Sequence, residues 1–181
     1  MSLIHLYVDG SCGDNRNVTK DTIAGWGVCI VSGDSGTGRG QGEVMEEISG
    51  RVITDPDIAG YIGASVGSNN TAELSAIAHA LRWLLINGEE SPARIRSDSS
   101  YASNLATGAW KPKTNKEIAH IVRELWIECE SIRPLSIEHV RAHRGHRWNE
   151  RADHLAYRAM EGRNPEPCLL YTSPSPRDTA L

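Results

Sequence analysis

The spacing of apolar residues divides the chain into segments of two kinds. Short runs rich in β-branched and aromatic residues predict strands, whereas apolar positions that recur every three or four residues predict amphipathic helices. Residues 69–88 carry apolar side chains at helical spacing, and an Asn-Gly pair ends the run. The predicted strands are residues 3–9, 24–32, 44–53, 93–99 and 135–142, and the predicted helices are residues 69–88, 99–107, 115–131 and 149–162.

The order of these elements predicts the fold class. Three consecutive strands precede an alternation of helices and strands, which is typical of an α/β fold with a mixed sheet covered by helices. The last helix is predicted to be capped by Asn149 and to end near Gly162. Half of the eight prolines lie beyond residue 164, where neither periodicity continues. We therefore expect one folded domain over residues 1–163 and a disordered tail over 164–181, which resembles translated adapter sequence and not a native C-terminus.

Length and composition exclude several classes of protein. A chain of 181 residues is long enough for one hydrophobic core and short for two. It lacks both a signal peptide and an apolar run of about 18 residues, so we expect a soluble cytoplasmic protein without a membrane partner. Its four cysteines stand apart without a C-x-x-C pair, which indicates neither a zinc site nor a disulfide framework.

The charge distribution is more informative than the net charge. A formal charge of −4 gives no overall reason to expect a nucleic-acid partner. However, residues 139–151 hold four arginines and three histidines against one acid, and residues 110–116 place three lysines beside Trp110. Either segment is a candidate nucleic-acid contact, and the alternative for each is an ordinary solvated basic face.

Carboxylates stand at four positions where chemistry is possible. They are at the end of the first strand, near the start of the long helix, at the end of the fourth strand and in the first turns of the last helix: Asp9, Glu73, Asp98 and Asp153. Each has a structural alternative. An aspartate before a glycine marks a turn, Glu73 can close a capping box with Asn70, and the last two favour helix N-termini.

Together the four positions indicate a metal site. Asp9 and Asp98 end strands that we expect to be parallel neighbours at the centre of the sheet. Glu73 shares a helical face with Ile77 and Leu81, the face that packs on the sheet. Carboxylates gathered in this way repel one another unless cations lie between them. Mg²⁺ prefers a few carboxylates together with water and phosphate oxygens, so it is the expected ion.

Four stretches of sequence carry a family resemblance. "YVDGS", "SNNTAEL", "SDSSY" and "VRAHRGHRWNERADHLA" occur in this order and resemble the signature blocks of type 1 ribonuclease H over residues 3–162. The resemblance implies a ribonuclease H-like fold with a five-stranded mixed sheet flanked by helices. It also implies a monomeric endonuclease that hydrolyses the RNA strand of RNA–DNA hybrids with two Mg²⁺ ions, for which Mn²⁺ substitutes. The implied products carry 5′-phosphate and 3′-hydroxyl ends.

The resemblance assigns roles to individual residues. It makes Asp9, Glu73, Asp98 and Asp153 the metal ligands, with Asp9 bridging both ions. One ion would activate a water molecule and the other would stabilise the leaving 3′ oxygen. His143 falls where the family places a histidine that moves protons or helps product to leave. His146 lies close by with the same chemistry and is the alternative.

Selection of a hybrid requires further contacts, because it depends on sensing 2′-hydroxyls in the shallow minor groove. Residues that match the family's positions at this groove are Gly10, Ser11, Cys12, Asn69 and Asn70. Candidates for holding the DNA strand by stacking and phosphate contact are Trp110, Lys111 and Asn115. The alternative for the last three is that they are ordinary loop residues.

The chain departs from the compact bacterial pattern of this family in two ways. About two dozen extra residues separate Asp9 from Glu73 and are expected to lengthen hairpin loops. The stretch from Asp98 to His143 is too short for the basic protruding helix that many members use to grip the hybrid.

Two other functions stay open at this point. One is a non-catalytic hybrid-binding module, which would have no need of four carboxylates. The other is the ribonuclease H portion of a reverse transcriptase, or a relative that acts on DNA junctions. From the start at Met1, just before the first strand, we expect a free-standing enzyme and not a portion of a reverse transcriptase.

Overall fold

A central five-stranded sheet organises the molecule, for which the computed structural model describes residues 1–36, 38–140 and 145–168. Within these residues the strands are β1 (Ile4–Cys12), β2 (Ala24–Ser32), β3 (Glu43–Arg51), β4 (Ala93–Ser97) and β5 (Leu135–His139). Their order across the sheet is β3-β2-β1-β4-β5. The first three strands pair antiparallel, and β4 and β5 join parallel. The predicted mixed sheet is therefore confirmed.

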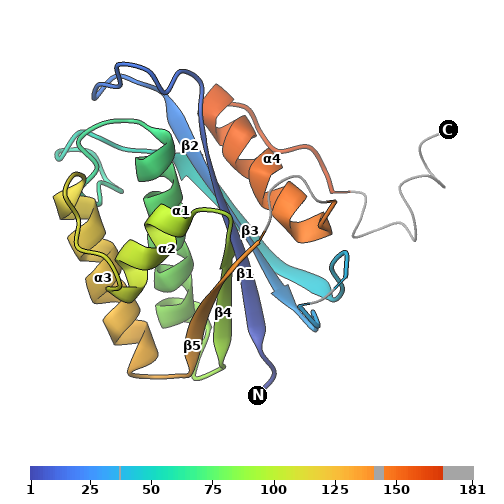
Figure 1. The fold of residues 1–181 in the computed structure, drawn as a ribbon. Coiled ribbons are helices and arrows are strands. Elements are labelled where there is room, and N and C mark those ends of the chain that lie inside the picture. The colour runs from blue at the N-terminus through green and yellow to red at the C-terminus, as the bar shows by residue number, and fades with distance from the viewer. Residues whose placement is uncertain (37, 141–144, 169–181) are drawn as a thin grey trace, which may run out of the picture.

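Helices cover both faces of the sheet. They are α1 (Asn69–Asn87), α2 (Ser100–Thr107), α3 (Lys116–Glu130) and α4 (Arg147–Glu161). Helices α1, α2 and α3 lie on one face and α4 lies alone on the other (Figure 1). Alternate residues of β1 serve the two layers, because successive side chains of a strand point to opposite faces. Leu6 and Val8 pack under α1, whereas Tyr7 packs with Trp148 and Leu155 of α4.

Helix α4 lies directly against the backbone of β2. A Cβ on Gly25 would come within 2.4 Å of the backbone oxygen of Ala156, and one on Gly27 within 2.7 Å of that of Ala152. Real side chains cannot approach so closely, so both positions require glycine. The pair explains why β2 reads as an apolar run interrupted by glycines, and it brings α4 close to the middle of the sheet.

The capping residues of two helices differ from those considered in the sequence, although α1 begins at Asn69 as predicted. Ser68 and Thr71 form the capping box of α1, with Ser68 Oγ accepting from the Thr71 amide at 3.0 Å and Thr71 Oγ1 accepting from the Ser68 amide at 2.9 Å. The alternative of a box between Asn70 and Glu73 is therefore not realised, because a serine and a threonine two residues earlier already satisfy the first amides. Glu73 is left available for other interactions.

The start of α4 lies earlier in the chain than expected. His146 is its N-cap, and its Nδ1 accepts from the amide of Asn149. Asn149 is thus the third residue of the helix and not its cap. The sequence favours Asn149 because asparagine is a common capping residue, whereas a histidine cap depends on a neighbour that fixes the ring.

The strand ends also refine the prediction. β1 continues to Cys12, so Asp9 lies within the strand and not at its end, whereas Asp98 follows the last residue of β4. Residues 141 and 142 of the predicted last strand, and residues 169–181 of the predicted tail, lie outside the described residues. Residues 164–168 form no helix or strand. Among the helices of the described chain, none combines the length and apolar character needed to cross a bilayer.

Candidate active site

Gly10 allows two acidic side chains from different elements to meet. A Cβ at this position would lie 2.7 Å from both the Cβ of Ala72 and the amide nitrogen of Glu73, so only glycine lets the first turns of α1 approach β1 this closely. The Gly10 amide donates to Asp9 Oδ1 at 2.9 Å and to Glu73 Oε1 at 3.1 Å. One backbone N–H therefore holds both carboxylates.

Asp98 completes a cluster of three carboxylates. It lies between the end of β4 and Ser99, the N-cap of α2. Because β1 and β4 are parallel neighbours, the two strands deliver Asp9 and Asp98 to the same edge of the sheet. One ligand oxygen from each of Asp9, Glu73 and Asp98 lies within 4.8 Å of the others. The expected convergence of these three residues is present.

Asp153 stands at the border of the cluster. It is exposed on α4 and does not belong to the group of oxygens within 4.8 Å of one another in the described chain. Its negative charge nevertheless contributes to raising the pKa of Asp9, so it faces the same site. Three of the four predicted carboxylates thus lie within 4.8 Å of one another. The fourth, Asp153, belongs to the helix on the opposite face of the sheet.

Burial makes the charge of this cluster unfavourable. Asp9 is 6% exposed and Glu73 is 8% exposed. Burial raises the pKa of Asp9 to about 8, and the charges of Asp98 and Asp153 add to this effect. Burial, followed by the charge of Asp9, raises the pKa of Glu73 well above its ordinary value. The cluster therefore resists full ionisation at neutral pH.

The donor set fits a hard divalent cation. Glu73 Oε2 is buried, and no hydrogen-bond donor in the described part of the chain reaches it. A buried carboxylate oxygen without a donor, facing two further carboxylates, offers the kind of oxygen ligands that Mg²⁺ and Mn²⁺ prefer. A bound cation would compensate the charge that burial disfavours.

Of the two candidate histidines, the structure describes only His146. His143 lies outside the described residues. His146 is 8% exposed and caps α4, and its Nε2 lies 3.3 Å from the hydroxyl of Tyr7. Burial lowers the pKa of His146, which favours the neutral ring that a cap requires. Both ring nitrogens of His146 therefore take part in contacts at the start of α4.

The predicted minor-groove residues lie beside the carboxylates. Asn69 and Asn70 are exposed in the first turn of α1, and Gly10 to Cys12 form the half-buried end of β1. Asn15 joins them, because its Oδ1 accepts from the amide of Asn69 at 2.9 Å. No motif in the sequence marks Asn15, which stands in an irregular loop, and only the folded chain brings it to α1.

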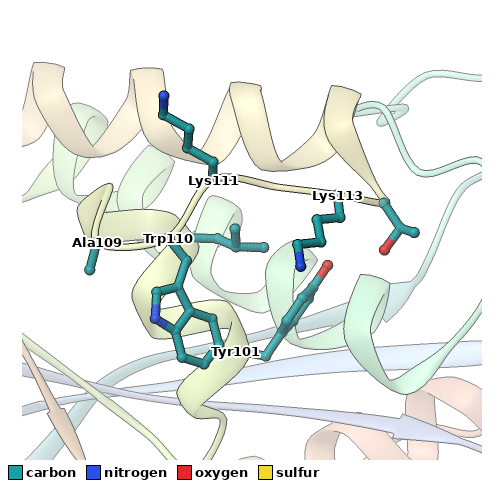
Figure 2. Close-up of a pocket in the computed structure, with 7 residues that line it drawn as sticks. Tyr101, Ala109, Trp110, Lys111 and Lys113 are labelled. Carbon is teal, nitrogen blue, oxygen red and sulfur yellow. The ribbon is translucent and has the colours of Figure 1, made fainter.

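A depression lies between α2 and the segment that connects α2 to α3. It has a volume of about 660 Å³ and is lined by Tyr101, Leu105, Ala109, Trp110, Lys111, Lys113 and Thr114. Trp110 is 51% exposed there. Figure 2 shows the rings of Trp110 and Tyr101 and the side chain of Lys113 on one side of the connecting segment, whereas Lys111 points away.

Asn115 is connected to this depression. Its Nδ2 donates to the Tyr101 hydroxyl at 3.2 Å, and its backbone adopts a left-handed conformation just before α3. Trp110 and Asn115, two of the three residues expected to hold a DNA strand, therefore share one surface with Tyr101 and Lys113, whereas the side chain of Lys111 points away from it. No helix intervenes between α2 and α3 along the fully described residues 108–115, in agreement with the expected lack of a protruding helix.

Comparisons with known proteins agree with this geometry. The sequence model of the family RNase H matches residues 2–161. The chain is 32% identical over 179 residues to a ribonuclease H of Ruegeria pomeroyi, covering 92% of this chain and 97% of the relative. It is 30% identical over 173 residues to one of Dinoroseobacter shibae, covering 88% and 92% respectively.

Solved structures show the same fold. The crystal structure of RNase H1 from Halobacterium salinarum NRC-1 has a TM-score of 0.63 at 26% identity, covering 88% of this chain and 98% of that one. The crystal structure of LC11-RNase H1 in complex with an RNA/DNA hybrid has a TM-score of 0.61 at 24% identity, covering 88% and 97%.

Replacement of Asp9 by asparagine is expected to stabilise the metal-free protein. A pKa raised to about 8 means that Asp9 contributes fully to stability below about pH 4, and that this contribution is lost as the pH rises through 8. In the presence of chelator at pH 8, the melting temperature of Asp9→Asn should therefore be higher than that of the wild type. The expected rise is about 2–4 °C for each kcal/mol of repulsion that the substitution relieves. The difference should disappear towards pH 4.

The measurement is thermal unfolding followed by circular dichroism across this pH range. Asp21→Asn is the matched control, because Asp21 is an exposed carboxylate in the loop between β1 and β2. A wild type more stable than Asp9→Asn at pH 8 in chelator would contradict the repulsion.

Proposed function

Because the chain belongs to the RNase H family, we propose that Asp9, Glu73, Asp98 and Asp153 hydrolyse the RNA strand of RNA–DNA hybrids by a two-metal-ion mechanism. The products would carry 5′-phosphate and 3′-hydroxyl ends. The observation that carries this proposal is the group of three carboxylates, two of them buried and Asp98 half-buried, whose oxygens lie within 4.8 Å of one another. A non-catalytic binding module would gain nothing from a cluster that resists ionisation.

Each acidic residue has a distinct task in this mechanism. Asp9 interacts with all three other carboxylates and would contact both ions, while the Gly10 amide keeps it aligned with Glu73. Asp98 and Asp153 would each supply a further carboxylate ligand to the two metal ions. Bound Mg²⁺ or Mn²⁺ would supply an activated water molecule and charge stabilisation of the leaving 3′ oxygen. The residues of the chain supply the fixed, partly buried geometry.

Recognition of the hybrid would use two surfaces, the residues around the start of α1 and the depression beside α2. Asn69 and Asn70, with the backbone of residues 10–12, would contact the 2′-hydroxyls of the RNA strand. Trp110, Lys111 and Asn115 would hold the DNA strand by stacking and phosphate contacts. We further propose that residues 1–163 form the catalytic domain and act as a cytoplasmic monomer.

The deciding experiment is cleavage of labelled substrates by the wild type and by Asp9→Asn. The wild type should cut RNA–DNA hybrid only with Mg²⁺ present, and it should leave duplex RNA and duplex DNA intact. Asp9→Asn should lose at least about a hundredfold in rate, because it removes a ligand shared by the two ions. It should still bind hybrid.

Asp21→Asn should cut like the wild type. A folded Asp9→Asn variant with near wild-type Mg²⁺-dependent cleavage would exclude the two-metal assignment. Hybrid binding in chelator, without cleavage in Mg²⁺, would instead favour a binding module.

His143 is proposed to assist proton transfer or product departure. If so, His143→Ala should lower turnover by about ten- to a hundredfold with metal affinity unchanged, in or below the range of a general acid–base group. His146→Ala should mainly lower the melting temperature, because that residue caps α4. Steady-state kinetics and melting curves for both variants check this. An equal loss of turnover from His146→Ala, with His143→Ala silent, would reverse the assignment.

The basic segment between α2 and α3 is expected to contribute to the salt dependence of hybrid binding. With a net charge of −4, we expect a shallow log–log slope on the order of −2 to −4. Lys111→Ala with Lys113→Ala should flatten it by roughly one unit per lost phosphate contact. The Michaelis constant should rise more than turnover falls.

Binding measured from low to physiological salt tests this expectation. Arg82→Ala with Arg163→Ala removes the same charge from exposed positions on α1 and after α4, and it is the matched control. A slope that is unchanged in the lysine variant, or that falls equally in both double variants, would exclude a specific contact by this segment.

A further inference from the structure

A buried chain of polar groups joins three elements at the start of α4. Tyr7 of β1 donates its hydroxyl hydrogen to Asp34, which lies in the loop between β2 and β3. The Tyr7 hydroxyl also lies 3.3 Å from Nε2 of His146, the N-cap of α4. Tyr7 is fully buried, and Asp34 and His146 are each 8% exposed. None of these side chains belongs to the carboxylate cluster.

The hydrogen bonds among Tyr7, Asp34 and His146 have only one possible order of donors and acceptors. His146 Nδ1 accepts from the Asn149 amide and therefore carries no hydrogen. The neutral ring must then carry its hydrogen on Nε2 and donate it to the Tyr7 oxygen. Tyr7 in turn donates to Asp34. Burial opposes ionisation of Asp34, but hydrogen bonds from Tyr7 and two amides lower its pKa overall, so it accepts as a carboxylate.

The loop between β2 and β3 binds the same helix start through its backbone. The carbonyl of Arg39 accepts from the Arg147 amide at 2.8 Å, and the carbonyl of Gln41 accepts from Trp148 Nε1 at 2.8 Å. Asp34 holds the loop itself, because its Oδ1 accepts from the Gly36 and Gln41 amides at 3.1 and 3.2 Å. Asp34 thus connects the loop to the polar chain.

Arg96 of β4 completes the surroundings of Tyr7. Its guanidinium carbon lies 5.6 Å from the centre of the Tyr7 ring, and it donates to the carbonyl of Gly36 at 3.3 Å. These contacts restrain the Tyr7 ring in addition to the hydrogen bonds of its hydroxyl group. The hydroxyl is therefore held in a fixed place relative to β1.

The position of α4 decides where Asp153 stands. Asp153 lies seven residues after His146, which is about two helical turns. At the contact with β2 the helix rests on Gly25 and Gly27, which have no side chains to interlock with it. The placement of α4 along its axis therefore depends on its other contacts, which include the packing of Trp148 and Leu155 against Tyr7 and the ion pair of Arg151 with Glu47 of β3. At the far end, Arg51 donates to the carbonyl of Met160 at 3.0 Å.

We propose that Tyr7, Asp34 and His146 are positioning residues that set the distance of the Asp153 carboxylate from Asp9, and with it the metal affinity of the site. This inference rests on the proposed function, because it takes Asp153 as a metal ligand. It adds to that function a tyrosine on β1 and an aspartate in a loop that contact neither metal nor substrate. Both act through the helix that carries Asp153.

The test is Tyr7→Phe, which keeps the ring and removes the hydroxyl that joins the two partners. The Mg²⁺ concentration for half-maximal cleavage should rise about tenfold, in the range found when a group that orients a metal ligand is removed. Turnover at saturating Mg²⁺ and the Michaelis constant for hybrid should stay within about twofold. Tyr61→Phe is the matched control, because the Tyr61 hydroxyl contacts Glu117 of α3 and not α4.

A double-mutant cycle separates positioning from general destabilisation. With Asp153 already changed to asparagine, Tyr7→Phe should have no further effect on Mg²⁺ affinity. Calorimetric titration with Mg²⁺ in the absence of hybrid provides this affinity without relying on cleavage. If Tyr7→Phe does not fold, Asp34→Asn breaks the same chain at its acceptor and takes its place.

The outcomes distinguish the two proposals. A wild type that binds Mg²⁺ and cuts hybrid, together with a folded Tyr7→Phe of unchanged Mg²⁺ affinity, would overturn the positioning role alone. An equal further loss of affinity in the Asp153→Asn background would also overturn it. A wild type that neither binds Mg²⁺ nor cuts hybrid would overturn the proposed function.

Discussion

The contact between Gly10 and the first turns of α1 is the constraint on which the site depends. Only a residue without a side chain lets α1 approach β1 closely enough for Glu73 to lie beside Asp9. The amide of the same residue then donates to both carboxylates. Bringing like charges together out of water is unfavourable, as the raised pKa values of both groups show. The fold therefore builds an environment that a divalent cation would relieve.

The rest of the architecture can be understood as support for this arrangement. Parallel pairing of β1 and β4 brings Asp98 to Asp9 at one edge of the sheet, and the capping box of Ser68 and Thr71 starts α1 without using Glu73. The site thus combines local stability of each element with a collective electrostatic cost. Such a cost at a functional centre is typical of proteins that trade stability for activity.

The carboxylate on the opposite face of the sheet is positioned by a different set of contacts. Asp153 comes from α4, which rests on glycines of β2 and is held at its start by His146 and the loop between β2 and β3. The fourth carboxylate is therefore placed by a separate set of contacts from those that place the first three. The loop between β2 and β3, in which the sequence shows no motif, is part of the support for this helix.

The sequence by itself determined the order of strands and helices and the identity of the acidic residues, because periodicity and motif order are local properties of a chain. It did not determine that His146 caps α4 instead of Asn149, that Asn15 meets Asn69, or that Tyr7 joins Asp34 to His146. These contacts connect residues far apart in the chain. Their partners are chosen by the packing of helices on the sheet, so only the tertiary structure could decide them.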